Sequence, residues 1–98
     1  MKKIFIECCV ESYDEARLAE KKGADQIEIC SDLRNDGLTP DLQLVEKIIN
    51  RISIPIKVMI RPRVGNFYYS NSEMLTIKDE IRNFKSIGID HIVFGVLD

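Results

Sequence analysis

Two short apolar runs of the chain each carry a carboxylate followed, two residues later, by a thiol. Glu7 precedes Cys9 in the first run, and Glu28 precedes Cys30 in the second. Side chains two apart on a strand share one face of a sheet, and a buried carboxylate is costly unless it is paired or serves a function. If the two strands are parallel neighbours, two acids and two soft sulfur ligands converge on one place.

Thiolates select Cu(I), so the two inward cysteines are candidate ligands for that ion. Free cysteine is also among the most buried residue types and packs as a small hydrophobic side chain. On the residues alone, both interpretations of Cys9 and Cys30 stay open. Cys8 points to the opposite face from Cys9, where core packing explains it.

The two carboxylates are candidates for acid/base chemistry or for holding a cation. Arg61 and Arg63 flank Pro62 and can share a face, where two guanidinium groups would suit a carboxylate or phosphate ligand. A structural alternative is an ion pair between Glu28 and Arg61 that also lines a ligand cavity. For Arg63, the alternative is a surface arginine that forms ion pairs with nearby acidic residues.

The aromatic cluster and the single histidine are given structural rather than chemical roles. The aromatic residues 67–69 form either a lid over the site or, as is more usual, an anchor that fixes their loop to the rim. The single histidine, His91, begins the last apolar run and is treated as neither catalytic nor a ligand.

Four apolar runs alternate with three helical patterns. The expected strands are residues 3–9, 26–30, 56–61 and 91–97. Capping residues predict the helix starts: Ser12 with Glu15, Thr39 followed by Pro40, and Ser70 with Glu73. The apolar residues expected to face the sheet from the second and third helices are Leu42, Val45, Ile49, Met74, Ile77, Ile81 and Phe84.

This alternation predicts an α/β fold with parallel strands and right-handed crossovers. The unusual residues lie at the carboxyl ends of the expected strands, which is where a (β/α)₈ barrel carries its chemistry, and no glycine-rich phosphate motif follows the first strand. We therefore predict the amino-terminal half of a TIM-type (β/α)₈ barrel. Residues 1–98 would form a partial domain that stops before barrel closure, because a full barrel needs eight strands.

Composition limits the classes of partner. The chain has 98 residues, a net charge of −2, 45% hydrophobic and 31% charged residues, which fits one small globular domain. This charge gives no electrostatic case for nucleic acid or an anionic membrane. No segment approaches the length of a membrane span, so we expect a cytoplasmic protein with reduced cysteines.

At these residues the sequence resembles the CutC copper-homeostasis family. The matching segments run in family order along the whole chain: Glu7 with Cys9, residues 23–25, 27–30, 37–40, 54–55, 60–63, Phe67, residues 69–70, Glu73 and residues 95–97. The resemblance implies a (β/α)₈-type barrel, a cytoplasmic location, self-association and copper handling, with Cys9 and Cys30 matching the proposed ligands. The chain departs from the usual family pattern at Gln26, Asp36, Asp41, Val64 and Asn66.

Two classes of function follow. In the first, the protein takes part in copper homeostasis and binds Cu(I) through Cys9 and Cys30 at the barrel mouth. In the second, it is an enzyme that holds a small carboxylate or phosphate substrate with Arg61 and Arg63, while Glu7 or Glu28 transfers a proton. The resemblance favours the first class, and a homo-oligomer is expected in either case.

Overall fold

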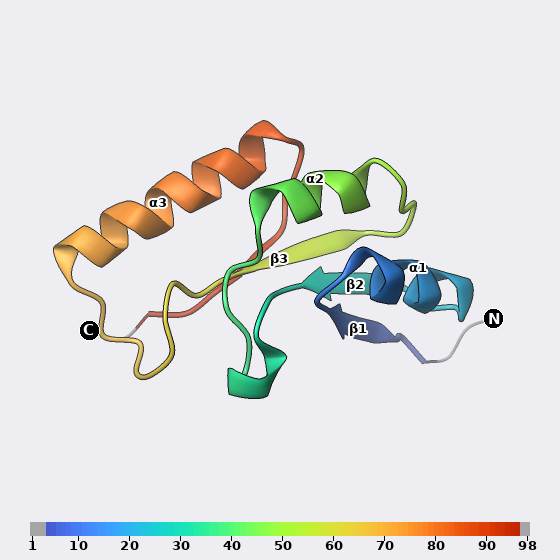
Figure 1. Ribbon diagram of the computed structural model, residues 1–98, viewed down its shortest axis with the longest axis horizontal. Coiled ribbons are helices and arrows are strands. Elements are labelled where there is room, and N and C mark those ends of the chain that lie inside the picture. Colours follow the sequence, from blue (N-terminus) through green and yellow to red (C-terminus); the bar gives the residue numbers. More distant parts are fainter. Residues whose placement is uncertain (1–3, 97–98) are drawn as a thin grey trace.

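The computed structural model describes residues 4–96, in which four parallel strands form one sheet accompanied by three α-helices (Figure 1). Strand and helix alternate along the chain, as the sequence predicts. The strands are β1 (Glu7–Val10), β2 (Gln26–Ile29), β3 (Ile56–Ile60) and β4 (Ile92–Phe94), and the helices are α1 (Tyr13–Lys21), α2 (Leu42–Ile49), α3 (Asn71–Ser86) and the short 3₁₀ helix η1 (Leu33–Asn35).

The sheet order is β1-β2-β3-β4, so each strand pairs with its neighbour in sequence through a helical crossover. α1 lies against α2, and α2 lies against α3. Figure 1 shows this succession of helices along the sheet. The strands are shorter than expected: β1 begins at Glu7 and β4 covers only three residues, while Lys3 and Leu97 fall outside the described residues.

The core lies between the sheet and the helices. Alternate residues of the strands supply one side of it, and the helices supply the other. Each fully buried aliphatic side chain contributes about 1.5–3 kcal/mol relative to an exposed one. The buried residues of this core are Val10, Ala16, Ile27, Ile29, Val45, Ile48, Ile52, Val58, Ile60, Ile77, Phe84 and Ile89.

Two helices begin at the predicted serines. Ser70 and Glu73 form the complete capping box of α3, in which each side chain accepts the other residue's backbone N–H. Ser12 accepts the N–H of Glu15 at 3.1 Å, as expected for a cap. The Glu15 carboxylate, however, accepts the N–H of Glu11 rather than that of Ser12, so the box is displaced by one residue.

The expected start of the second helix is wrong by two residues. Asp41, not Thr39, caps α2, and its carboxylate accepts the N–H of Leu44 at 3.3 Å. The Thr39 hydroxyl instead accepts the N–H of Arg61 at 2.8 Å, and the Thr39 N–H donates back to the Arg61 carbonyl. Thr39 therefore ties the loop before α2 to the end of β3, and both an aspartate and a threonine suit an N-cap.

The late start of α2 also moves one predicted core residue outward. Leu42 is 37% exposed because it occupies the first helical position, whereas Val45 and Ile48 are fully buried. Ile49, Met74 and Ile81 pack at the border of the core, and Ile77 and Phe84 lie within it, as predicted. Within residues 4–96, no helix is long and apolar enough to cross a membrane.

Candidate functional site

The strand side chains that do not join the core form the second face of the sheet, which we call the inner face. Cys8 and Val10 pack toward the helices, so Glu7 and Cys9 must point the other way. The same alternation applies to the next two strands. The inner face comprises Glu7 and Cys9 of β1, Gln26 and Glu28 of β2, and Lys57 and Met59 of β3. The inward placement predicted for Glu7, Cys9 and Glu28 is confirmed. The predicted position of Glu7 at the carboxyl end of its strand is wrong, because Glu7 is the first residue of β1.

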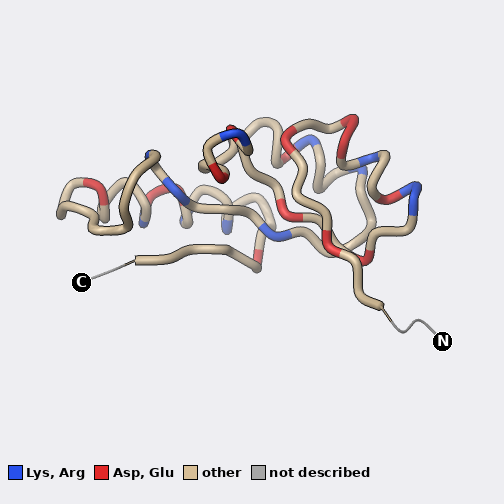
Figure 2. The backbone as a smooth tube through the Cα atoms, turned by 90° about the horizontal axis from the view of Figure 1, so that it is seen from below, with Lys and Arg blue, Asp and Glu red and all other residues tan. Residues whose placement is uncertain are grey.

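Four of these side chains form an acid–lysine cluster: Glu7, Gln26, Glu28 and Lys57. One carboxylate oxygen of Glu7 accepts from the Gln26 amide and from the Lys57 ammonium, the latter at 3.2 Å. Strand register places Glu28 directly between Cys9 and Lys57. Figure 2 shows acidic and basic positions meeting where the strands run side by side. Two acids and one amine thus converge on this face.

The two carboxylates of the cluster have opposite pKa shifts. Hydrogen bonding by Gln26 and the charge of Lys57 hold the pKa of Glu7 below its ordinary value. Burial raises the pKa of Glu28, which is only 8% exposed, and the adjoining Glu7 carboxylate raises it further. Opposite shifts in neighbouring carboxyl groups are the arrangement in which one group can serve as acid and the other as base.

The two candidate copper ligands differ in exposure. Cys9 is exposed on β1, whereas Cys30 is fully buried just after β2, with its thiol directed at the carbonyl of Val10 at 3.8 Å. Burial is the largest cause that raises the pKa of both thiols, and it takes the pKa of Cys30 to about 12. Both are therefore thiols at neutral pH, and a metal ion would have to displace their protons.

Cys9 and Cys30 are diagonal neighbours rather than direct partners. Cys9 pairs with Glu28, and Cys30 lies two residues further along its strand. Strand spacing and rise place their Cα atoms roughly 8 Å apart. Rotation of the two side chains toward each other is needed for both sulfurs to reach one ion.

Arg61 does not pair with Glu28 as suggested. Its guanidinium donates to the carbonyl oxygens of Asn35 at 2.8 Å, Gly37 at 3.2 Å and Gly65 at 3.1 Å, and lies over the Phe67 ring at 5.3 Å. Three carbonyls in two loops therefore use most of its donors. Arg61 joins the loop after β2 to the loop after β3.

Arg63 is likewise engaged within its own loop. It binds the Glu73 carboxylate at 2.5 Å, donates to the carbonyls of Asn66 and Tyr68, and lies 4.9 Å from the Tyr69 ring centroid. These contacts favour the structural interpretation of Arg63 over the anion clamp, which stays a prediction.

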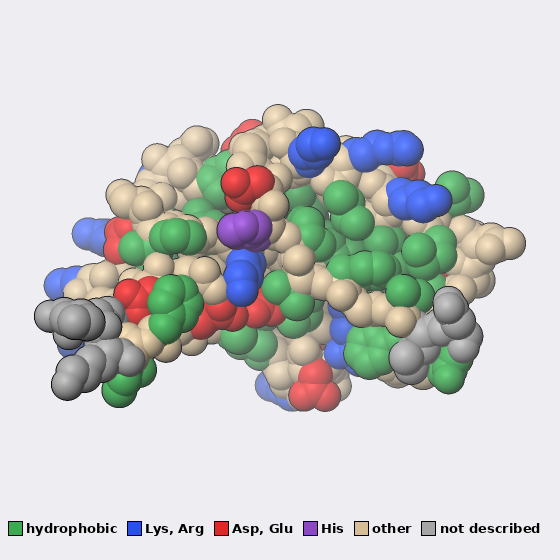
Figure 3. All heavy atoms as spheres, turned by 180° about the vertical axis from the view of Figure 1, so that it is seen from behind, with side chains coloured by type: hydrophobic (Ala, Val, Ile, Leu, Met, Phe, Trp, Pro, Cys, Tyr) green, Lys and Arg blue, Asp and Glu red, His purple; other side chains and the backbone are tan. Residues whose placement is uncertain are grey.

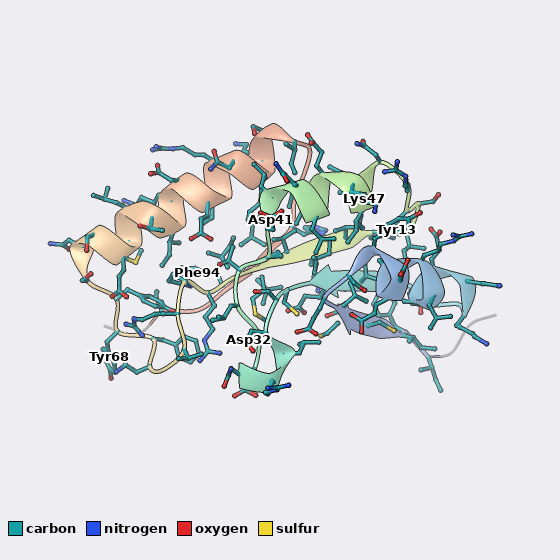
Figure 4. All side chains as sticks on the ribbon, in the orientation of Figure 1. Tyr13, Asp32, Asp41, Lys47, Tyr68 and Phe94 are labelled. Carbon is teal, nitrogen blue, oxygen red and sulfur yellow. The ribbon has the colours of Figure 1, made fainter. Side chains whose placement is uncertain are left out.

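The aromatic residues of this loop anchor it to the sheet, which favours the anchor interpretation over that of a lid. The Tyr69 ring stacks on Phe94 of β4 and meets Phe67 edge-on, both at 6.5 Å between centroids. Tyr68 is 56% exposed at the loop's outer side, well away from Phe94 in Figure 4.

Sequence reasoning missed three inner-face residues, Gln26, Lys57 and Met59. The alternation that predicts an inward Glu28 and an inward Arg61 places all three on the same face, so the signal was present in residues 26–30 and 56–61. A cavity of about 560 Å³ opens beside Met59 and Arg61 at the carboxyl ends of β3 and β4. In residues 4–96, no three His, Cys, Asp or Glu side chains gather as a metal-binding group.

Parallel strands in sequence order, joined by crossover helices, are the arrangement of a (β/α)-barrel type of protein. A crystal structure of a CutC protein from Streptococcus agalactiae superposes with a TM-score of 0.85 at 26% identity, covering 96% of this chain and 47% of that one. The predicted fold class is therefore confirmed.

The CutC family model matches residues 4–98, and the chain belongs to the CutC family. Similar curated proteins are the copper homeostasis protein cutC homologs of Homo sapiens and Mus musculus, 45% and 44% identical over 93 residues. Each match covers 95% of this chain and 34% of the relative. The chain thus spans about a third of the curated relatives it matches.

Proposed function

We propose that this protein takes part in copper homeostasis by binding Cu(I) through Cys9 and Cys30. The observation that carries the proposal is that Cys9 lies on the inner face of β1 and that Cys30 directly follows β2, the neighbouring strand, two residues after the Cys9 partner Glu28. Thiolates are soft ligands that favour Cu(I), and the relatives are copper homeostasis proteins by name. A reducing cytoplasm, where such thiols stay unpaired, is the compartment that this function requires.

The proposal is tested by Cu(I) titration of the purified protein under reducing conditions, in competition with a chromophoric chelator. We expect saturable binding of one ion per chain. Cys9→Ser and Cys30→Ser should weaken it by at least about tenfold, because a hydroxyl is a poor partner for a soft ion. Cys30→Ala serves as a second variant, since Cys30 is fully buried and a new hydroxyl there could disturb packing.

Cys8→Ser is the matched control, because Cys8 adjoins Cys9 in sequence but packs toward the helices. Equal effects of Cys8→Ser and Cys9→Ser would contradict the assignment by face. Unchanged binding in folded Cys9 and Cys30 variants would place any copper site elsewhere.

A second candidate function rests on the acid–lysine cluster. The opposite pKa shifts of Glu7 and Glu28, beside Lys57, support an enzyme that transfers a proton on a small carboxylate or phosphate substrate. Arg61 and Arg63 contribute less than expected to an anion clamp, because carbonyls and Glu73 use their donors. Calorimetric titration with inorganic phosphate tests this function, and the absence of saturable binding would contradict it.

We also propose self-association. Within the described residues, β1 and β4 each pair on one side only, and an open strand edge is a template for further pairing. Exposed large hydrophobic side chains accompany these edges, among them Ile4 and Phe5 before β1 and Phe94 in β4.

A further inference from the structure

Met59 places a third sulfur atom beside Cys30. β2 and β3 pair Glu28 with Lys57 and Ile29 with Val58, and Cys30 and Met59 are the residues that directly follow the last pair. Neighbouring strands lie about 4.8 Å apart, which makes these two residues lateral neighbours on the inner face. Cys9 approaches Cys30 from the other side, one strand away.

The packing around Gly37 places the Met59 sulfur and the base of the Cys30 side chain next to the same glycine. A Cβ atom at Gly37 would lie 2.7 Å from the Sδ of Met59 and 3.6 Å from the Cβ of Cys30. The same small volume is therefore bordered by the thioether and by the base of the thiol side chain. Gly37 has a φ of +93°, and its lack of a side chain leaves room for the sulfur.

The Met59 side chain is also accessible from outside the core. It is half-buried, and it lines the cavity of about 560 Å³ together with Phe67, Val93 and Phe94. An entry path is one of the features a metal site must have. The buried Cys30 has no such opening of its own, so an ion would reach it past Met59 or past the exposed Cys9.

We propose that Met59 is a third ligand, which completes a Cys9–Cys30–Met59 site for a soft monovalent ion such as Cu(I). The inference rests on the proposed copper function and adds a residue to it. A thioether is a soft ligand that suits Cu(I), and it carries no proton that the metal must displace. The alternative is that Met59 only fills space on the inner face, as flexible methionines often do.

The test is Met59→Leu in the purified protein, with Met74→Leu as the matched control. Both changes conserve volume and should leave the fold intact, as circular dichroism will verify. Met74 lies on α3 at the border of the core, away from the inner face. We expect Met59→Leu to weaken Cu(I) binding by at least about tenfold, since even the loss of a residue that only orients a ligand costs roughly 10- to 100-fold in metal affinity. Met74→Leu should leave it unchanged.

X-ray absorption of the Cu(I)-loaded protein provides an independent measurement. We expect three sulfur neighbours in the wild type and two in Met59→Leu. Met59→Cys should restore the third sulfur. Two sulfur neighbours in the wild type, or equal affinities of Met59→Leu and Met74→Leu, would overturn the assignment of Met59.

The two proposals fail in different ways. If Cys9→Ser and Cys30→Ser abolish binding but Met59→Leu does not, the copper function stands and Met59 only packs. If none of these variants changes binding, the copper site itself is refuted, and Met59 with it.

Discussion

At the scale of single residues, the ionisation of a glutamate depends on the groups that surround it. Glu7 is held charged by Gln26 and Lys57, whereas Glu28, one strand away, is kept protonated to higher pH by burial and by Glu7 itself. Glu73 is a third case, in which a helix cap and an ion pair act on one carboxylate.

The pH dependence of stability tests the role of Glu73. Pairing with Arg63 and the N–H of Ser70 lower the pKa of Glu73 to about 2. Because the pKa is depressed on folding, the stabilisation is present above the ordinary value of 4.5 and is lost as pH falls from there toward 2. Glu73→Gln should therefore lower the melting temperature at pH 7, and the difference from wild type should shrink across this window.

Glutamine keeps the acceptor for the Ser70 N–H and removes only the charge. Glu46→Gln, at an exposed position of α2, is the matched control and should give a small difference. A difference for Glu73→Gln that is constant from pH 7 down to pH 2 would contradict the role of the charge.

At the scale of elements, the loops at the carboxyl ends of the strands are joined by side chain to backbone contacts. Arg61 joins the loop after β2 to its own, and Thr39 joins the start of α2 to the end of β3. α1 and α2 are also joined by side chains, because the Lys47 Nζ lies 4.8 Å from the Tyr13 ring centroid. Figure 4 shows the two residues close together. Contacts between neighbouring β/α units thus hold the carboxyl ends of the strands and the helices in place.

The capping of α2 gives a prediction at this scale. Asp41→Ala should destabilise the protein by about 1 kcal/mol, the usual cost of losing an N-cap side chain. Hydrogen exchange at the Leu44 amide should accelerate, since that N–H donates to Asp41. Asp41→Asn keeps an acceptor and serves as the control.

Thr39→Ala should act on a different amide. Its hydroxyl accepts the N–H of Arg61, so exchange should accelerate at Arg61 and not at Leu44. The reverse pattern, with Thr39→Ala exposing the first turn of α2, would restore Thr39 as the cap.

At the scale of the whole molecule, apolar surface is unevenly distributed. Figure 3 shows hydrophobic side chains gathered over one half of the face seen from behind, with acidic side chains toward the other half. A separate exposed apolar segment lies before β1, where Ile4 is 70% and Phe5 67% accessible. Large exposed apolar patches usually mark surfaces that bind another protein segment.

We therefore expect the 98-residue chain to associate in solution. Sedimentation velocity should show dimers or larger species whose fraction rises with protein concentration. Phe5→Glu should shift the distribution toward monomer, because it places a charge beside the open edge of β1. Lys78→Glu, on the exposed side of α3, is the control. A cooperative, folded monomer at all concentrations would refute the proposed self-association.

The sequence by itself determined the alternation of strands and helices and the inward placement of Glu7, Cys9 and Glu28. Both depend on short-range sequence patterns. Side chains two apart share a face of a strand, and a helix N-cap is recognised from a serine and the residue three positions later. The same rule also places Lys57 and Met59 inward, although neither residue belongs to a recognisable sequence motif.

Only the tertiary structure decided which of these inward residues meet. The register sets Cys9 beside Glu28 rather than beside Cys30, and it brings Lys57 to Glu7 across two strand intervals. Arg61 donates hydrogen bonds to carbonyl oxygens of two loops because the turn that contains Gly37 lies against the end of β3. Register and loop closure depend on contacts between residues 19 to 50 positions apart, which no local pattern encodes.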